Sequence, residues 1–401
     1  MNNHCSLLVG LLLSASACSS DSTRKVASSL PTKVDKPAAD SAAAWRPLSE
    51  FLSRHQAPVQ EFEVPTDQPT QVSGTNGSRV IIPAHAFVIA ANGRLVQGPV
   101  SLELREYYGL ADVLLQRLST QSAGDLLATR GMVYLKATSE GETCHLRPGV
   151  ALAVLFPAAK PEKGFRLFAG KTATGQSPRT WQPLPPPQVA TVPALLRRPR
   201  YAATGKPAQR EDYVWRNVCQ RIPLSAKQAE AAFRLALRKK GPNEMQADSA
   251  NELNSYAFAS TQLAWLNCDR VVSYPGKKIN LAMPVENTPA VYSLVFKDYS
   301  VVVSGEQKSG LLSFGSVPKD ALATLVGIRW RNGQVQLATR DVVLSPGISP
   351  ELTFQTVSMA KLLESINRLD SKHQWPPAKV SPRDATQRTI VLPKTPCFFD
   401  L

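Results

Sequence analysis

The sequence lacks the short motifs that gather metal-binding or catalytic side chains. None of its six cysteines forms a C-x-x-C pair, and its five histidines form neither H-x-x-x-H nor H-E-x-x-H. Because zinc sites usually depend on such spacings, the sequence does not support a local metal site. The dinucleotide-binding G-x-G-x-x-G, the P-loop and the hydrolase motif G-x-S-x-G are also absent. We therefore expect no metal, no cofactor and no catalytic motif.

Acidic residues are scarce relative to basic ones. The chain holds 46 Lys and Arg but only 31 Asp and Glu, which gives a formal net charge of +15. The excess is concentrated between Arg197 and Lys240, where twelve basic residues stand against three acidic ones. Such a segment can bind anionic lipid, acidic glycan, nucleic acid or an acidic protein. A solvated linker and helix face would have the same composition.

After the N-terminal segment, the sequence contains no long apolar run. Residues 6–13 form a short apolar run that is typical of an export signal. Ala15-Ser-Ala-Cys18 follows it and resembles a bacterial lipobox. The resemblance implies a signal peptide at residues 1–17 and acyl chains on Cys18, which would become the first mature residue. In the same sorting pattern, Ser19 implies the outer membrane.

The segment after Cys18 favours the lipoprotein. It is rich in Ser, Ala, Lys and Pro up to Ala44, and a surface anchor needs a flexible spacer. We expect a lipidated tether at residues 18–58, a membrane partner through Cys18, and no nucleic acid in this compartment. The alternative is a secreted or periplasmic protein, because Ala15-Ser-Ala17 is also an ordinary A-x-A cleavage site.

Four cysteines remain after the lipobox: Cys144, Cys219, Cys268 and Cys397. An exported protein can form two disulfides from them, in three connectivities between which the sequence does not choose. Buried free thiols are the alternative.

Short strand-like runs separated by Gly, Pro and Asn-Gly predict a mainly β fold with sandwich character. Asn92-Gly93 and Asn332-Gly333 are typical of type I′ hairpins, because both residue types tolerate positive φ. Helical spacing of apolar residues predicts helices at residues 45–60, 109–118, 225–240 and 359–369.

These elements predict two β-sandwich-like domains joined by a basic linker with one amphipathic helix, plus a closing C-terminal helix. The expected boundaries are residues 59–187 for the first sandwich, 188–245 for the basic linker and helix, 246–372 for the second β-domain with its closing helix, and 373–401 for a Pro-rich tail.

The first β-domain resembles a ZU5 domain through Arg79-Val-Ile-Ile-Pro-Ala-His-Ala-Phe87, Gly98-Pro-Val-Ser-Leu-Glu-Leu104 and Gly131-Met-Val-Tyr134. The resemblance implies a β-sandwich that binds a protein partner. Some ZU5 domains precede a self-cleaving domain that cuts at His-Phe-Ser. The nearest string here is Leu312-Ser-Phe-Gly315, so self-cleavage is not implied.

More widely, the chain is similar to a group of gram-negative envelope lipoproteins. Residues 120–132, 167–170 and 263–270 carry this second resemblance. The last of these segments usually has Gly where this chain has Ala264. The resemblance implies no activity.

Ser358-Met-Ala-Lys361 spells S-x-x-K, the nucleophile motif of penicillin-recognising enzymes. The S-D-N and K-T-G motifs that accompany it in those enzymes are missing. Ser358 begins an amphipathic pattern, where a Ser is expected as a helix cap. We therefore predict a structural role for it.

The most distinctive polar cluster is Asn267-Cys-Asp-Arg270, close to Trp265. We expect Asp269 and Arg270 to form a buried structural pair; the alternative is that they line a pocket. The aromatic residues that could stack on sugar rings, or pack in the core or at its rim instead, are Tyr107, Tyr108, Trp181 and Trp330.

Taken together, these features predict a non-enzymatic binding or scaffold module anchored to the outer membrane. The first alternative is a surface protein that binds anionic glycan or lipid through the basic segment. The second is an envelope hydrolase whose site is assembled from distant residues, since such sites are recognised by geometry rather than by spacing.

Overall fold

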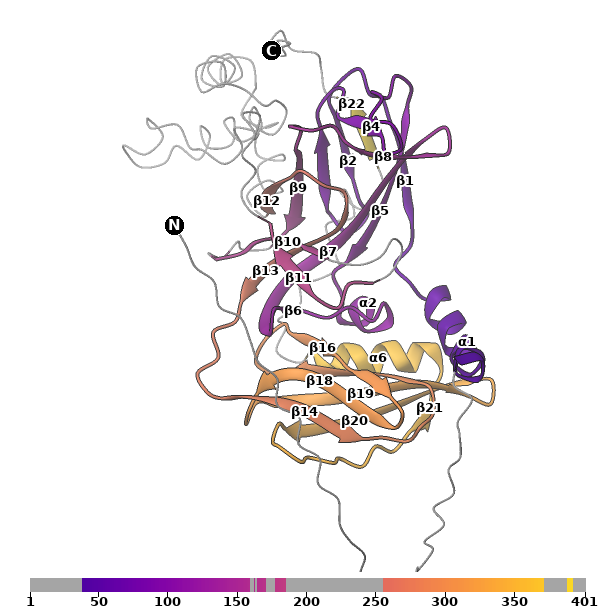
Figure 1. The fold of residues 1–401 in the computed structure, drawn as a ribbon, viewed down its shortest axis with the longest axis vertical. Helices are drawn as coiled ribbons and strands as arrows, with labels where there is room; N and C mark the ends of the chain where they lie inside the picture. The colour runs from indigo at the N-terminus through magenta and orange to yellow at the C-terminus, as the bar shows by residue number, and fades with distance from the viewer. Residues whose placement is uncertain are drawn as a thin grey trace, which may run out of the picture. The chain divides into compact units, whose positions relative to one another are not determined.

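The computed structural model describes residues 38–158, 162, 164–170, 177–184, 255–370 and 388–391. The expected signal peptide, Cys18, the basic segment with its helix, and Cys219 and Cys397 lie outside these residues. The chain divides into two compact units at Ala42, and the sheets described below belong to the second unit. The described part is mainly β, as predicted, with antiparallel sheets (Figure 1).

The N-terminal β unit is a sandwich of two sheets. The larger sheet has the order β1 (Gln60–Val64), β5 (Val100–Tyr107), β7 (Asp125–Ser139), β13 (Ala264–Val271), β10 (Arg166–Gly170) and β11 (Trp181–Pro183), with β4 (Phe87–Ile89), β6 (Gln121–Ser122) and β8 (Glu142–Leu146) beside this path. The smaller sheet has the order β12 (Ser255–Ser260), β9 (Leu152–Pro157), β3 (Arg79–Ile82), β2 (Thr70–Ser73) and β22 (Arg388–Val391). Alternating apolar side chains, among them Leu102, Leu104 and Val154, fill the space between the two sheets.

The C-terminal β unit also contains two sheets. The small sheet has the order β14 (Lys278–Pro284), β18 (Leu311–Pro318) and β17 (Glu306–Lys308). The other has the order β16 (Val302–Ser304), β15 (Ala290–Phe296), β19 (Leu322–Arg331), β20 (Gln334–Val343) and β21 (Gln355–Thr356). Leu281, Leu294 and Phe314 belong to the core that these two sheets share.

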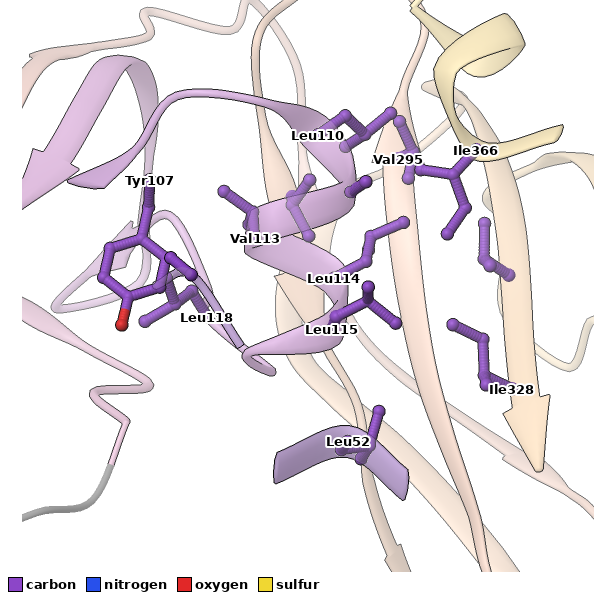
Figure 2. Packing of buried hydrophobic residues seen from close by; sticks show 14 of the residues in the cluster. Leu52, Tyr107, Leu110, Val113, Leu114, Leu115, Leu118, Val295, Ile328 and Ile366 are labelled. Carbon is purple, nitrogen blue, oxygen red and sulfur yellow. The ribbon is translucent and has the colours of Figure 1, made fainter. Parts of the chain in front are cut away.

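A helical layer joins the two β units. It consists of α2 (Leu110–Leu115), α6 (Met359–Leu369) and the part of α1 (Ala38–Arg54) from Ala43 onwards. Figure 2 shows Leu114 and Leu115 of α2 close to Val295 of β15, Ile328 of β19 and Ile366 of α6, all in one buried cluster. The cluster also takes in α1 side chains beyond Ala43 and residues of the larger sandwich sheet. The two β units therefore share an apolar core.

Three helix predictions fall on described residues, and the structure confirms each. The crossover helix is α2 and the closing helix is α6. The predicted helix at residues 45–60 is part of α1, which ends at Arg54, and its side chains Leu48, Phe51 and Leu52 are buried as expected.

The predicted domain boundaries differ from the observed strand pairing. β12 pairs with β9, and β13 pairs with both β7 and β10, so both strands belong to the first sandwich and not to a second domain. The basic segment consequently lies between two strands of the sandwich, β11 and β12. The expected tail also contributes β22, which pairs with β2. These pairings join residues far apart in sequence, which local patterns do not reveal.

The two predicted hairpins have different outcomes. Asn332 and Gly333 both have positive φ (53° and 75°) and connect β19 to β20, which confirms the type I′ prediction. Asn92-Gly93 makes a turn in which Gly93 has a φ of 72°. Asn92 does not have a positive φ, so the turn is not of type I′. The two arms nevertheless pair around the Val88–Leu95 bridge, because the backbone N–H groups of Ile89 and Val96 donate to the carbonyls of Arg94 and Phe87.

Ala264 begins β13 with a φ of 79°, a region that glycine adopts without the steric cost of a Cβ atom. We predict that Ala264→Gly raises the free energy of unfolding by about 1 kcal/mol. Urea unfolding of the full chain measures the change. Ala282→Gly, at an exposed position of β14 outside the positive-φ region, should instead destabilise by about 0.5–1 kcal/mol. Loss of stability in Ala264→Gly would contradict the prediction.

Candidate functional site

The predicted polar cluster lies on β13 at an irregularity of the sandwich sheet. β13 pairs with β7, and the register shifts between Asn267 and Asp269. Gly131 lies opposite this shift with a φ of 131°, and a Cβ atom there would lie 2.1 Å from the ring of Tyr108. The bulge therefore requires glycine at this position, and it redirects the side chains around it.

The predicted pairing of Asp269 with Arg270 is wrong. Neighbouring residues of a strand point to opposite faces of the sheet. Asp269 is fully buried, whereas the Arg270 side chain is 42% exposed and its Nη1 donates to Oε2 of Glu162 at 3.1 Å. The two residues thus take part in separate interactions.

Asp269 belongs to a buried hydrogen-bonded chain. Oγ1 of Thr129 donates to Oδ1 of Asn267 at 3.0 Å, and Nδ2 of Asn267 donates to Oδ2 of Asp269 at 2.6 Å. Oδ1 of Asp269 has no hydrogen-bond partner among the described residues. Burial raises the pKa of the Asp269 carboxyl well above its ordinary value, and the side-chain hydrogen bonds offset only part of this effect.

The hydrogen-bonded chain of Thr129, Asn267 and Asp269 lies where the two β units meet. The backbone N–H of Thr129 donates to the carbonyl of Ser300, just before β16. Thr120 makes a similar connection, since its backbone N–H and its hydroxyl both bond to the carbonyl of Val302. The N–H of Val302 in turn donates to Oγ1 of Thr120 at 2.9 Å. We therefore assign the Asp269 chain a structural role at this junction.

The aromatic candidates are used in packing. Trp265 is buried, and its ring centroid lies 5.1 Å from the centroids of both Tyr107 and Tyr134. The ring of Trp330 packs against Phe51 with centroids 5.2 Å apart. The remaining candidates, all at most 1% exposed, are Tyr107, Tyr108 and Trp181. Core packing therefore explains these rings better than stacking on sugars.

Ser358 is the N-cap of α6, as predicted. Its hydroxyl accepts a hydrogen bond from the backbone N–H of Lys361 at 3.2 Å. The ammonium group of Lys361 pairs with Glu364 at 3.1 Å and not with the serine. The S-x-x-K spacing thus serves helix capping here.

Cys144 and Cys268 are both buried and free. Burial raises the pKa of each thiol. Neither residue therefore presents a reactive thiolate, and the alternative of buried free thiols describes both. Their two expected partners, Cys219 and Cys397, lie outside the described residues.

Sequence reasoning missed one buried carboxylate, that of Glu106. It accepts hydrogen bonds from Nε2 of Gln60 (2.9 Å) and from the backbone N–H groups of Asn76 and Ser78 (both 2.8 Å). A Cβ atom on Gly74 would lie 2.4 Å from this carboxylate. Glu106 thus anchors the turn before β3. The available signal was the cluster of turn-forming residues at 74–78.

Arg270 contributes to an accessible cluster that its sequence neighbours did not indicate. The carboxylate of Glu162 pairs with Arg270 through one oxygen and with Arg130 through the other. Both guanidinium groups lie close to the ring of Phe165, with Cζ atoms 5.2 Å (Arg130) and 5.0 Å (Arg270) from its centroid. Partial burial alone would raise the pKa of Glu162, but the hydrogen bond and charge of Arg130 and the charge of Arg270 lower it overall.

Within the described ranges, no group of three or more His, Cys, Asp and Glu side chains could hold a metal ion. In the same part of the chain, no helix is both long and apolar enough to cross a membrane. Comparison of the chain with protein-family models, with curated proteins and with solved structures finds no match.

The raised pKa of Asp269 predicts a pH-dependent stability. The unfolded chain releases this proton first, so stability falls as the pH rises from the ordinary aspartate pKa towards the higher native one. We expect the wild type to lose up to about 1.4 kcal/mol per pH unit relative to Asp269→Asn over that window. Urea unfolding from about pH 4 upwards measures this difference.

The matched control is the variant Asp320→Asn, because the Asp320 side chain is 67% exposed. Its stability should follow that of the wild type across the same pH range. Identical pH profiles for Asp269→Asn and the wild type would show that the buried carboxyl does not titrate as proposed.

Proposed function

We propose that this chain is an outer-membrane lipoprotein that acts as a binding or scaffold module of the cell envelope, without an enzymatic activity of its own. The short apolar run, Cys18 and the spacer after it support the anchor. The position of the basic segment between β11 and β12 carries the binding role.

The described strands that precede and follow that segment in the sequence both belong to the sandwich. β11 pairs with β10 through Phe168, Ala169 and Gly170, and β12 pairs with β9 along six residues. Binding residues are frequently carried by connections that a rigid sheet scaffold positions. The concentration of positive charge between two such strands supports a role in recognition rather than in joining domains.

The side chains that resembled catalytic groups have structural partners, which supports the non-enzymatic proposal. Ser358 caps α6, and Lys361 pairs with Glu364. Asp269 receives a hydrogen bond from Asn267 inside the junction of the two β units. Each of these groups thus has a function in folding.

A second candidate is the binding of an anionic glycan or lipid. The basic segment between Arg197 and Lys240 favours it, as do the half-exposed Arg270 and the partly buried Arg130. Contacts of this kind weaken at high ionic strength, because exposed charges are screened beyond about 10 Å at 0.1 M salt.

The proposed anchor predicts the effect of removing Cys18. Cys18→Ala should move the protein from the outer-membrane fraction to the soluble fraction, because without the acyl chains no stable hydrophobic attachment remains. Immunoblots of fractionated envelopes measure the distribution. Cys144→Ala, a change at a buried free thiol, should stay in the membrane fraction. Firm membrane attachment of Cys18→Ala would contradict the anchor.

The binding role is tested by purifying the tagged full-length chain from detergent-solubilised envelopes at low and at high salt. A stoichiometric protein that remains at high salt supports the scaffold role. Glycan or lipid recovered only at low salt supports the second candidate. Recovery of neither would contradict both.

A further inference from the structure

Arg130 and Arg270 converge on one carboxylate from neighbouring strands. Arg130 lies at the bulge of β7, and Arg270 lies on β13 opposite Ala128. Glu162 binds one guanidinium group with each of its oxygens. The cluster therefore already has the geometry of an anion site, and a side chain of the protein occupies it.

Aromatic packing holds the two guanidinium groups in place. Both lie within about 6 Å of the Phe165 ring, the range of cation–π attraction. Phe165 in turn packs against Tyr256 of β12, with ring centroids 4.9 Å apart. Because these contacts do not involve the Glu162 carboxylate, the arginines are positioned for an anion even without it.

The donors of the cluster outnumber the acceptor oxygens of Glu162. Each guanidinium group carries five N–H donors, whereas the carboxylate offers one oxygen to each of them. A phosphate monoester carries between about 1.5 and 2 negative charges at neutral pH, and its oxygens match the guanidinium donors. The side chains of Glu162 and Arg270 are 40% and 42% exposed, and that of Arg130 is 18% exposed, so a ligand can reach the cluster.

We propose that Arg130 and Arg270 bind the phosphate monoester group of an envelope ligand, and that this group replaces the carboxylate of Glu162. The inference rests on the proposed binding function and names the chemistry of its ligand. Glu162 then acts as an internal competitor, which keeps the two arginines paired when no ligand is bound. The three acceptor oxygens of the phosphate match the forked guanidinium donors better than a single carboxylate does.

The first test is calorimetric titration of inorganic phosphate into the full chain. Glu162→Gln removes the competing charge with little change of shape, so we expect it to bind phosphate about tenfold more tightly than the wild type. Adding Arg270→Gln to this variant should abolish the gain. Arg270→Lys should restore only part of it, because an ammonium group keeps the charge but lacks the forked donors of arginine.

A matched pair on the same sandwich provides the control. Arg94 and Glu142 form an exposed ion pair at 3.9 Å, and no second arginine of the described residues pairs with this glutamate. Glu142→Gln should leave phosphate affinity unchanged. All variants share the basic segment, so its contribution cancels in the comparison. Thermal unfolding of each variant checks that the fold is retained, as expected for a partly exposed side chain such as Arg270.

Equal phosphate affinity in the wild type and Glu162→Gln, or an unchanged gain after Arg270→Gln, would overturn the proposal. Glucose 6-phosphate and dihexanoyl phosphatidic acid then distinguish a soluble sugar phosphate from a lipid headgroup, and preference for either one supports the proposal. If the protein binds no phosphate at these arginines but retains its envelope partner, the phosphate site is refuted. The proposed binding function is then not contradicted.

Discussion

The five-stranded sheet of the C-terminal β unit is apolar on both faces, and the rest of the described structure depends on covering them. Along β15, Leu294 faces the small sheet of its own unit, whereas Val295 faces the helical layer. Val326 and Ile328 of β19 continue the second face. Exposing this face to water would cost about 25 cal/mol for each square ångström of apolar surface. α2, a crossover helix of the sandwich, covers it together with α6.

Polar groups are buried at the same junction, and hydrogen bonds compensate most of them. β16 is an edge strand that pairs with β15 on one side only, and Thr120 supplies both a donor and an acceptor to its outer side at Val302. Asp269 is one exception, with one oxygen unpartnered among the described residues and a raised pKa. We propose ligand recognition elsewhere, at the basic segment between β11 and β12 and at the accessible cluster of Arg130, Glu162 and Arg270.

Features that depend on local sequence were predictable. The Asn332-Gly333 hairpin follows from two residues that tolerate positive φ, and Ser358 follows from the amphipathic pattern it begins. Long-range pairing was not predictable in this way. Glu162 is 108 residues from Arg270 in the sequence. The residues of β13 predict a strand, but they do not indicate which strands pair with it. For the same reason the first domain boundary was misplaced and the two-arginine cluster was missed, although Arg270 itself was singled out.

The shared helical layer should make the two β units one cooperative body. Hydrogen exchange of the full chain at increasing urea, read by mass spectrometry, measures this cooperativity, with Leu114→Ala as the perturbation. Leu114 is buried in the shared core, so this change should cost about 2–5 kcal/mol. We expect β7 and β13 to lose protection at the same urea concentration as β15 and β19, and the variant to shift all four strands together. Loss of protection in one unit while the other stays protected would contradict it.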